Sequence, residues 1–177
     1  MSLSETIGYY LFIFVLVIVG GVCESCYNSY MYEPWELKDQ PNYIGADGHD
    51  ITLIDNPNAT DPTYGQLFLF IDMDKTDEKE YIHGVYTCGD YAEDVHNNAE
   101  ALGIKAGWVA IDFEGHAVGH AINVFNTTDK GLVYFDCTEC DIEVAPECGE
   151  EYTNSFIDVG KHIFEPMGIV SNIEIYW

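Results

Sequence analysis

Basic residues are scarce in this sequence. Six Lys and Arg stand against 31 Asp and Glu, which gives the 177-residue chain a formal net charge of −25 at pH 7. A surface this acidic repels nucleic-acid phosphates and excludes a general DNA or RNA binder. Six cysteines are too few for a small disulfide-rich scaffold. Apolar residues make up 47% of the chain, enough to bury the core of one globular domain, so wholesale disorder is excluded.

Charge is also missing from a long run near the N-terminus. Residues 7–22 read IGYYLFIFVLVIVGGV, and as a helix they would span about 25 Å, close to the lower limit for crossing a bilayer. No Lys or Arg precedes the run, so positive charge does not mark its orientation. A retained signal-anchor is favoured over a cleaved signal peptide and a buried core helix. Glycosylation sequons at Asn58 and Asn126 agree with export. We therefore expect a single-pass cell-membrane protein whose globular part lies outside the cytoplasm.

Three parts follow from the distribution of breakers and apolar residues. Residues 1–23 are predicted to form the membrane anchor, residues 24–50 a loop-rich stalk, and residues 51–177 the globular domain. Prolines and glycines interrupt the chain up to residue 62 and leave room for a short strand at residues 51–54. A helical pattern begins at Thr63. The alternation of Ile173, Ile175 and Trp177 predicts a last strand that closes a sheet.

Cys88 stands at the predicted start of a second helix. Apolar residues at positions 92, 95, 99 and 102 share one helical face, and Gly103 is a suitable C-terminal stop. The free N–H groups and the dipole at a helix N-terminus favour an anion, so a thiol there has a lowered pKa and becomes a nucleophile. An isolated cysteine can equally be a small buried core residue.

A histidine and an aspartate follow on predicted strands. Residues 107–113, 119–126 and 131–137 have strand patterns, and the last two form a hairpin with His120 and Asp136 at its open end. The two side chains share a face only if the loop has odd length. A loop of three or five residues would make His120 and Asp136 direct neighbours, whereas a loop of four residues would place Cys137 opposite His120. In a triad, His120 would pair with Cys88 and protonate a leaving amine, while Asp136 would orient the imidazole.

Four separated pieces of the sequence resemble the transglutaminase-like superfamily. They are residues 86–92 (YTCGDYA), 103–106 (GIKA), 119–121 (GHA) and 134–136 (YFD), and the chain looks most like small surface-exposed prokaryotic members, including archaeal ones. The resemblance implies an α+β, papain-like core in which the nucleophile helix packs on a central antiparallel sheet. It assigns Cys88 as nucleophile, His120 as base and Asp136 as orienting carboxylate. No cofactor and no metal are implied.

The reaction that such a triad performs stays open at this point. A thiolate that attacks an amide carbonyl gives an acyl-enzyme, and water as acceptor makes a peptidase or amidase, whereas a lysine amine makes a transglutaminase. The substrate would be a protein or peptide, with a cell-envelope polypeptide as one candidate. The alternative is an inactive module of the same fold that binds at the cell surface. For the oxyanion, the Cys88 N–H is one donor, and Gln66, Tyr86 and Trp108 are candidates for a second.

Metal sites are less favoured by the sequence. His116 and His120 could serve a metal-dependent hydrolase, but the surrounding pattern is a strand and not a zinc-binding helix. A disulfide between Cys140 and Cys148 is the first choice across an acidic loop, with zinc binding and free thiols as alternatives. His96 is expected on a polar helix face or in a contact with a loop. Acidic loops are expected to bind divalent cations weakly, without a discrete site.

Overall fold

The computed structural model describes residues 40–157 and 164–177. They belong to one compact unit, Glu36–Trp177. The predicted membrane anchor at residues 1–23 and most of the predicted stalk lie outside the described residues. Within the part of the chain that the structure describes, no helix is long and apolar enough to cross a bilayer.

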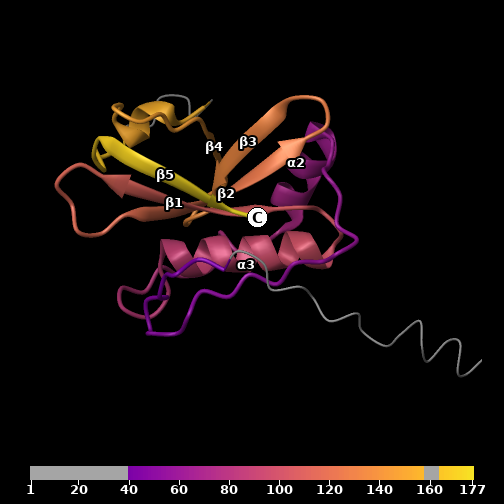
Figure 1. The fold of residues 1–177 in the computed structure, drawn as a ribbon, viewed down its shortest axis with the longest axis horizontal. Helices are drawn as coiled ribbons and strands as arrows, with labels where there is room; N and C mark the ends of the chain where they lie inside the picture. The colour runs from indigo at the N-terminus through magenta and orange to yellow at the C-terminus, as the bar shows by residue number, and fades with distance from the viewer. Residues whose placement is uncertain (1–39, 158–163) are drawn as a thin grey trace, which may run out of the picture. The chain divides into compact units, whose positions relative to one another are not determined.

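An antiparallel sheet organises the unit, as the sequence predicted. Its five strands lie in the order β4-β3-β2-β1-β5, and each pair of neighbours is antiparallel. The strands are β1 (Gly107–Phe113), β2 (His120–Thr127), β3 (Gly131–Asp136), β4 (Ile142–Val144) and β5 (Val170–Tyr176) (Figure 1). The C-terminal strand therefore joins the sheet beside β1. With the helices below, the chain belongs to the α+β class.

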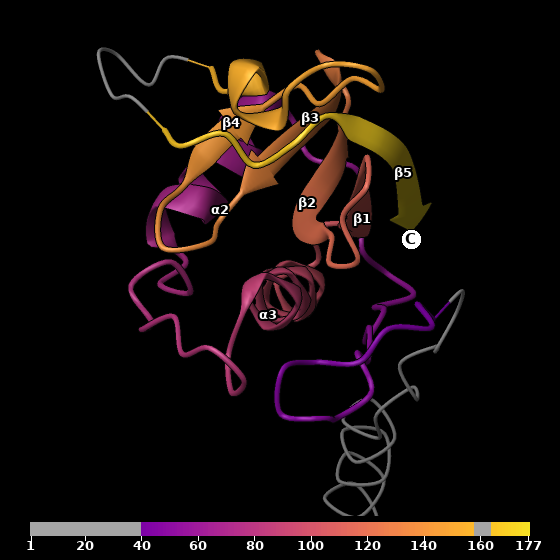
Figure 2. The ribbon, with the colours of Figure 1, turned by 90° about the vertical axis from the view of Figure 1, so that its left-hand side faces the viewer.

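Two α-helices and one short 3-10 helix cover the sheet. They are α2 (Tyr64–Met73), α3 (Cys88–Ala101) and the 3-10 helix η1 (Tyr152–Ser155). Figure 2 looks along α3 and shows it against β1 and β2, while η1 lies on the other side of the sheet. Both faces of the central strands are therefore buried. This explains why six of the seven residues of β1 and seven of the eight residues of β2 are enclosed, where a half-exposed strand would alternate buried and exposed residues.

Each sheet face has its own apolar core, and strand alternation decides which residues enter it. In β2 and β3 the odd-numbered side chains face α3. The even-numbered side chains of these two strands face away from it. The core on the α3 side includes Val95, Ala99, Phe125, Val133 and Phe135. The core on the η1 side includes Val109, Ile111, Ile122, Val124 and Tyr152.

The local sequence explains the limits of α3. Its N-cap is Thr87, whose backbone N–H donates to the buried Asp90 carboxylate at 2.7 Å, and this acid in the first turn also suits the helix dipole. Gly103 ends the helix with a φ of 78°, a left-handed conformation that favours glycine. Leu102 was predicted on the apolar face but is 70% exposed, because the helix ends at Ala101 and the backbone turns away.

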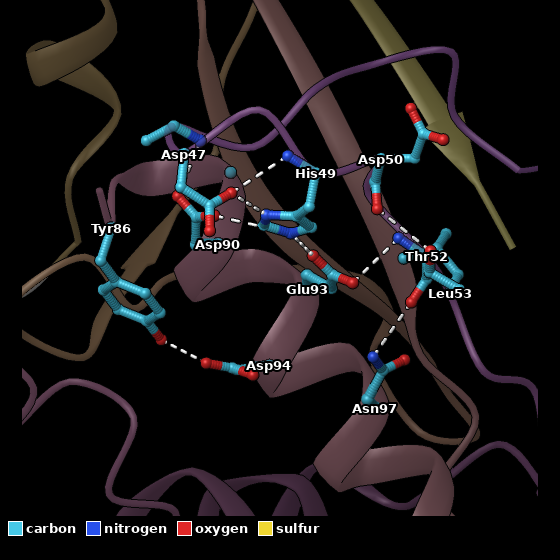
Figure 3. Close-up of polar contacts among 12 residues, drawn as sticks. Asp47, His49, Asp50, Thr52, Leu53, Tyr86, Asp90, Glu93, Asp94 and Asn97 are labelled. Atoms are coloured by element: carbon cyan, nitrogen blue, oxygen red, sulfur yellow. Dashed lines mark hydrogen bonds and ion pairs between the residues drawn. The ribbon is translucent and has the colours of Figure 1, made fainter. Parts of the chain in front are cut away.

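Residues 40–62 form an irregular strap that runs along α3. The prediction of a strand at residues 51–54 is wrong, because these residues form no strand. Ile51 and Leu53 are nevertheless buried, in the alternating pattern that suggested a strand. Side chains of α3 take the hydrogen bonds that a sheet partner would have made. The Thr52 N–H donates to Glu93 at 2.9 Å (Figure 3), and the Ile54 N–H donates to Asn97 at 2.8 Å. Residues 40–50, assigned from sequence to the stalk, are part of this strap.

Candidate active site

The β2–β3 hairpin sets which side chains share a face at its open end. Thr127 still belongs to β2, where it pairs with Gly131, so the loop is residues 128–130 and has odd length. Gly131, the residue that follows the loop, has a φ of 74°, a left-handed conformation that favours glycine, and the Thr127 hydroxyl donates to its carbonyl at 2.8 Å. The odd loop keeps His120 and Asp136 on one face of the sheet, which was the condition for a triad.

His120 and Asp136 lie diagonally across the hairpin and not directly opposite each other. The register pairs Asn123 with Phe135, which displaces the two residues by two positions from the direct pairing that we expected. An even displacement preserves the face, and diagonal neighbours remain within reach of long side chains. The His120 Nε2 lies 2.7 Å from the Asp136 Oδ2, and both side chains are buried.

Two further donors fix the Asp136 carboxylate. The Tyr152 hydroxyl donates to Oδ2 at 2.8 Å, and the Thr138 N–H donates to Oδ1 at 3.1 Å. The Tyr152 ring also packs edge-on against the His120 ring, with centroids 5.2 Å apart. Sequence reasoning missed Tyr152, because η1 comes from an irregular acidic segment with no periodic pattern that relates it to the hairpin.

Cys88 and His120 lie together at the start of β2, where they line the same two pockets. It is the first residue of α3, on the face opposite to His120, but the β2–β3 ladder starts only at Asn123. Ala121 therefore lacks a β3 partner, and both its backbone N–H and the His120 ring lie close enough to the Cys88 sulfur to lower the pKa of the thiol. Since Asp136 occupies Nε2 of the imidazole, Nδ1 is the nitrogen left for the thiol.

The three groups shift one another's ionisation in the directions that catalysis needs. Burial raises the pKa of Cys88, but the hydrogen bond and charge of His120 outweigh it, and the pKa of the thiol is lowered. Burial lowers the pKa of His120, but the Asp136 charge and hydrogen bonds to Asp136 and Cys88 raise it well above its ordinary value. The pKa of Asp136 is lowered by His120 and Tyr152 against the effect of burial. The pair therefore ionises to a thiolate and an imidazolium more readily than an isolated thiol and an isolated imidazole would.

Two pockets open on either side of this pair. The smaller pocket, of about 300 Å³, extends toward the strap and Trp108, and the larger pocket, of about 650 Å³, extends toward Phe156, Phe164 and Met167. Both are lined by Cys88 and His120, together with Thr87, Val118 and Gly119. A bound chain could therefore continue in two directions from the sulfur.

Of the three side chains considered for an oxyanion site, Trp108 is the one at the pocket. Its indole N–H donates to the Gly89 carbonyl at 3.3 Å, next to Cys88. Gln66 instead caps α2, where its side-chain oxygen accepts the Thr63 N–H at 2.9 Å. The Tyr86 hydroxyl donates to Asp94 (Figure 3). The N–H of Cys88 at the start of α3 stays the first candidate donor.

The other candidate residues do not join the site as metal ligands or as a disulfide. His116 is exposed on the turn between β1 and β2, whereas His120 is committed to Asp136. Among the described residues, these two histidines belong to no cluster of metal-ligating side chains. The disulfide expected between Cys140 and Cys148 is not formed, since both are free thiols. Cys140 lines the larger pocket, where burial and nearby acids raise its pKa to about 11.

No protein-family model, curated protein or solved structure matches the chain.

Proposed function

We propose that the protein is a cysteine-dependent hydrolase or acyltransferase that acts on amide bonds, as the resemblance to transglutaminase-like proteins implied. One observation carries the proposal: a single buried imidazole lies 2.7 Å from the Asp136 carboxylate and lines the same two pockets as the thiol at the N-terminus of α3, whose pKa it lowers. Burying the Asp136 carboxylate costs free energy, even with three hydrogen-bond donors around it. A role in orienting a catalytic imidazole would explain why the carboxylate is there.

The proposed chemistry proceeds through an acyl-enzyme. The Cys88 thiolate attacks the amide carbonyl and forms a carbon–sulfur bond, while the carbonyl π electrons move to oxygen at the start of α3. When the tetrahedral intermediate collapses, the carbon–nitrogen bond breaks and the His120 Nδ1 proton passes to the leaving amine. His120 then takes a proton from water or from an acceptor amine, which attacks the thioester and releases Cys88.

The two pockets support both halves of this reaction. The scissile carbonyl must lie at Cys88, so the acyl group occupies one pocket, and the leaving amine departs through the other. The acceptor enters where the amine left, because the second half reverses the geometry of the first. Hydrolysis and transfer then differ only in whether water or an amine fills that pocket.

The proposed setting is the outer face of a membrane. The uncharged run at residues 7–22 would anchor the chain, and the acidic domain would meet a protein or peptide substrate, such as a cell-envelope polypeptide, outside the cytoplasm. The alternative that the sequence left open is an inactive module of the same fold. Enzymatic turnover separates the two: a Cys88-dependent release of amine from peptide amides, or incorporation of a labelled amine, belongs to the enzyme alone.

Site-resolved alkylation tests the proposal without a known substrate. Iodoacetamide should modify Cys88 at about pH 6 at least tenfold faster than Cys140, with each site measured by mass spectrometry of its peptide. His120→Ala should abolish that advantage, whereas His116→Ala, on the exposed turn, should preserve it. Equal rates at Cys88 in the wild type and in His120→Ala would contradict the proposal.

A further inference from the structure

A second cluster of ionisable side chains lies on α3, away from the triad. His96 and Glu100 are four residues apart and so share one face of the helix, and Asp55 approaches them from the strap. One ligand atom from each side chain lies within 4.8 Å of the other two. His96 is fully enclosed, Glu100 is 2% exposed, and Asp55 is half-buried at the rim.

The hydrogen bonds of Asn97 determine the tautomer of His96. The Asn97 Oδ1 accepts the Ile54 N–H at 2.8 Å, while its Nδ2 donates to the Thr52 carbonyl at 3.1 Å (Figure 3), so the amide cannot be turned over. The His96 Nδ1 lies 3.1 Å from that same Oδ1 and must therefore carry the proton. The His96 Nε2 is then an unprotonated lone pair.

That lone pair is buried and points into the cluster. The His96 Nε2 has no hydrogen-bond partner, and the Asp55 Oδ1 lies 3.5 Å from it. A cation bound between this nitrogen and the carboxylate oxygen would satisfy both atoms.

Glu100 is held in place as a carboxylate beside this nitrogen. Its Oε1 accepts the Ala106 N–H at 2.8 Å, and its Oε2 accepts the Asn56 N–H at 2.9 Å. Each oxygen keeps a further lone pair. The two backbone donors orient Glu100, and Asn97 orients His96, in the way that outer partners position metal ligands.

We propose that Asp55, His96 and Glu100 bind one divalent transition-metal ion of the zinc class. Metal–ligand bonds of about 2.0–2.2 Å at a tetrahedral centre require ligand atoms about 3.4 Å apart, and the His96–Asp55 pair is at 3.5 Å. One divalent cation balances two carboxylates, and water would complete the shell on the side of Asp55. An imidazole with two oxygens suits Zn²⁺, whereas Ca²⁺ takes six to eight oxygen ligands.

The ion would fasten the strap to α3. Asp55 belongs to the same strap whose residues Tyr43, Ile44 and Ile51 line the smaller pocket beside Cys88. Metal binding would therefore stabilise the wall of that pocket, but the metal would not take part in the thiol chemistry. The site and the triad are separate, and each can be tested without the other.

Titration of the full-length protein with metal tests the proposal. After treatment with a chelator, the protein should bind one Zn²⁺, and at a hundredfold excess over Kd its Tm should rise by roughly 5–10 °C. Ca²⁺ at the same concentration should give a smaller shift. Co²⁺ should give visible d–d bands without the strong thiolate charge-transfer band that ligation by cysteine would produce.

Variants separate the cluster from the acidic surface. Asp55→Asn removes a ligand at a partly exposed position and should weaken Zn²⁺ binding at least tenfold, whereas Asp50→Asn makes the same charge change on the same strap and should leave binding unchanged. His96→Gln is the second ligand variant. Equal Zn²⁺ affinity in Asp55→Asn and Asp50→Asn, a thiolate band with Co²⁺, or an equal Tm shift with Ca²⁺ would overturn the proposal.

Discussion

The Tyr152 hydroxyl offers a sharp test of how the site is held together. Tyr152→Phe removes the donor that lies 2.8 Å from the Asp136 Oδ2 but keeps the ring that packs against His120. Asp136 keeps its bonds to His120 and Thr138, so the carboxylate loses one of three partners. Its pKa should then rise, because the Tyr152 hydrogen bond is one of the causes that lower it.

The size of the effect follows from the charge on the acceptor. A hydrogen bond to a buried ionised group contributes about 1.5–3 kcal/mol, which is the expected loss in the free energy of unfolding at pH 7. For a unit of this size the Tm should fall by roughly 5–10 °C. Urea denaturation and thermal melts measure both quantities, and the alkylation rate of Cys88 should fall because the imidazolium is less well supported.

Tyr134→Phe is the matched control. Tyr134 lies on the same face of β3, two residues before Asp136, and its raised pKa comes from burial alone. We expect a change within about 0.5 kcal/mol and an unaltered alkylation rate. A loss in Tyr152→Phe no larger than in Tyr134→Phe would refute the idea that Tyr152 supports the triad.

Two further predictions concern charge. Hydrogen bonds to Glu93 and Asp47 raise the pKa of His49 to about 9 (Figure 3), above its unfolded value near 6.5, so its contribution to stability is complete below pH 6.5 and is lost as the pH rises through 9. The contribution should be below about 1 kcal/mol, because the ring is 42% exposed. In His49→Gln the free energy of unfolding should change less between those two pH values than in the wild type. An equal slope in the variant would contradict the prediction. The net charge of −25 predicts that NaCl raises the Tm by screening self-repulsion, and a Tm that is independent of salt would show that repulsion is unimportant.

The regular elements were predictable because their signals are local. The spacing of Ala92, Val95 and Ala99 predicted α3, and the strand pattern at residues 107–113 matches β1 to the residue. The alternation near the C-terminus predicted β5. Strand ends were harder: the sequence left the parity of the hairpin loop open, because one added strand residue, Thr127, reverses it.

The supports of the site were not predictable, because they come from irregular segments. Nothing in the sequence relates Tyr152 to Asp136, and the contact depends on how η1 packs on the sheet. The strap shows the same limit. The burial of Ile51 and Leu53 alternates as it would in a strand. However, the backbone N–H groups of Thr52 and Ile54 donate to side chains of α3 and not to another strand. His96 was expected on a polar face or in a contact with a loop; it is enclosed beneath the strap, where its Nε2 lies 3.5 Å from the Asp55 Oδ1.

The charge state of Cys88 tests the central claim most directly. The ultraviolet absorbance of the thiolate, taken as the difference between the wild type and Cys88→Ser, can be followed from acidic to alkaline pH. The proposed thiolate–imidazolium pair predicts a midpoint below about pH 7.5, and the midpoint should shift upward in His120→Ala. A midpoint at about 8.5, the value of a free thiol, in both proteins would contradict the account.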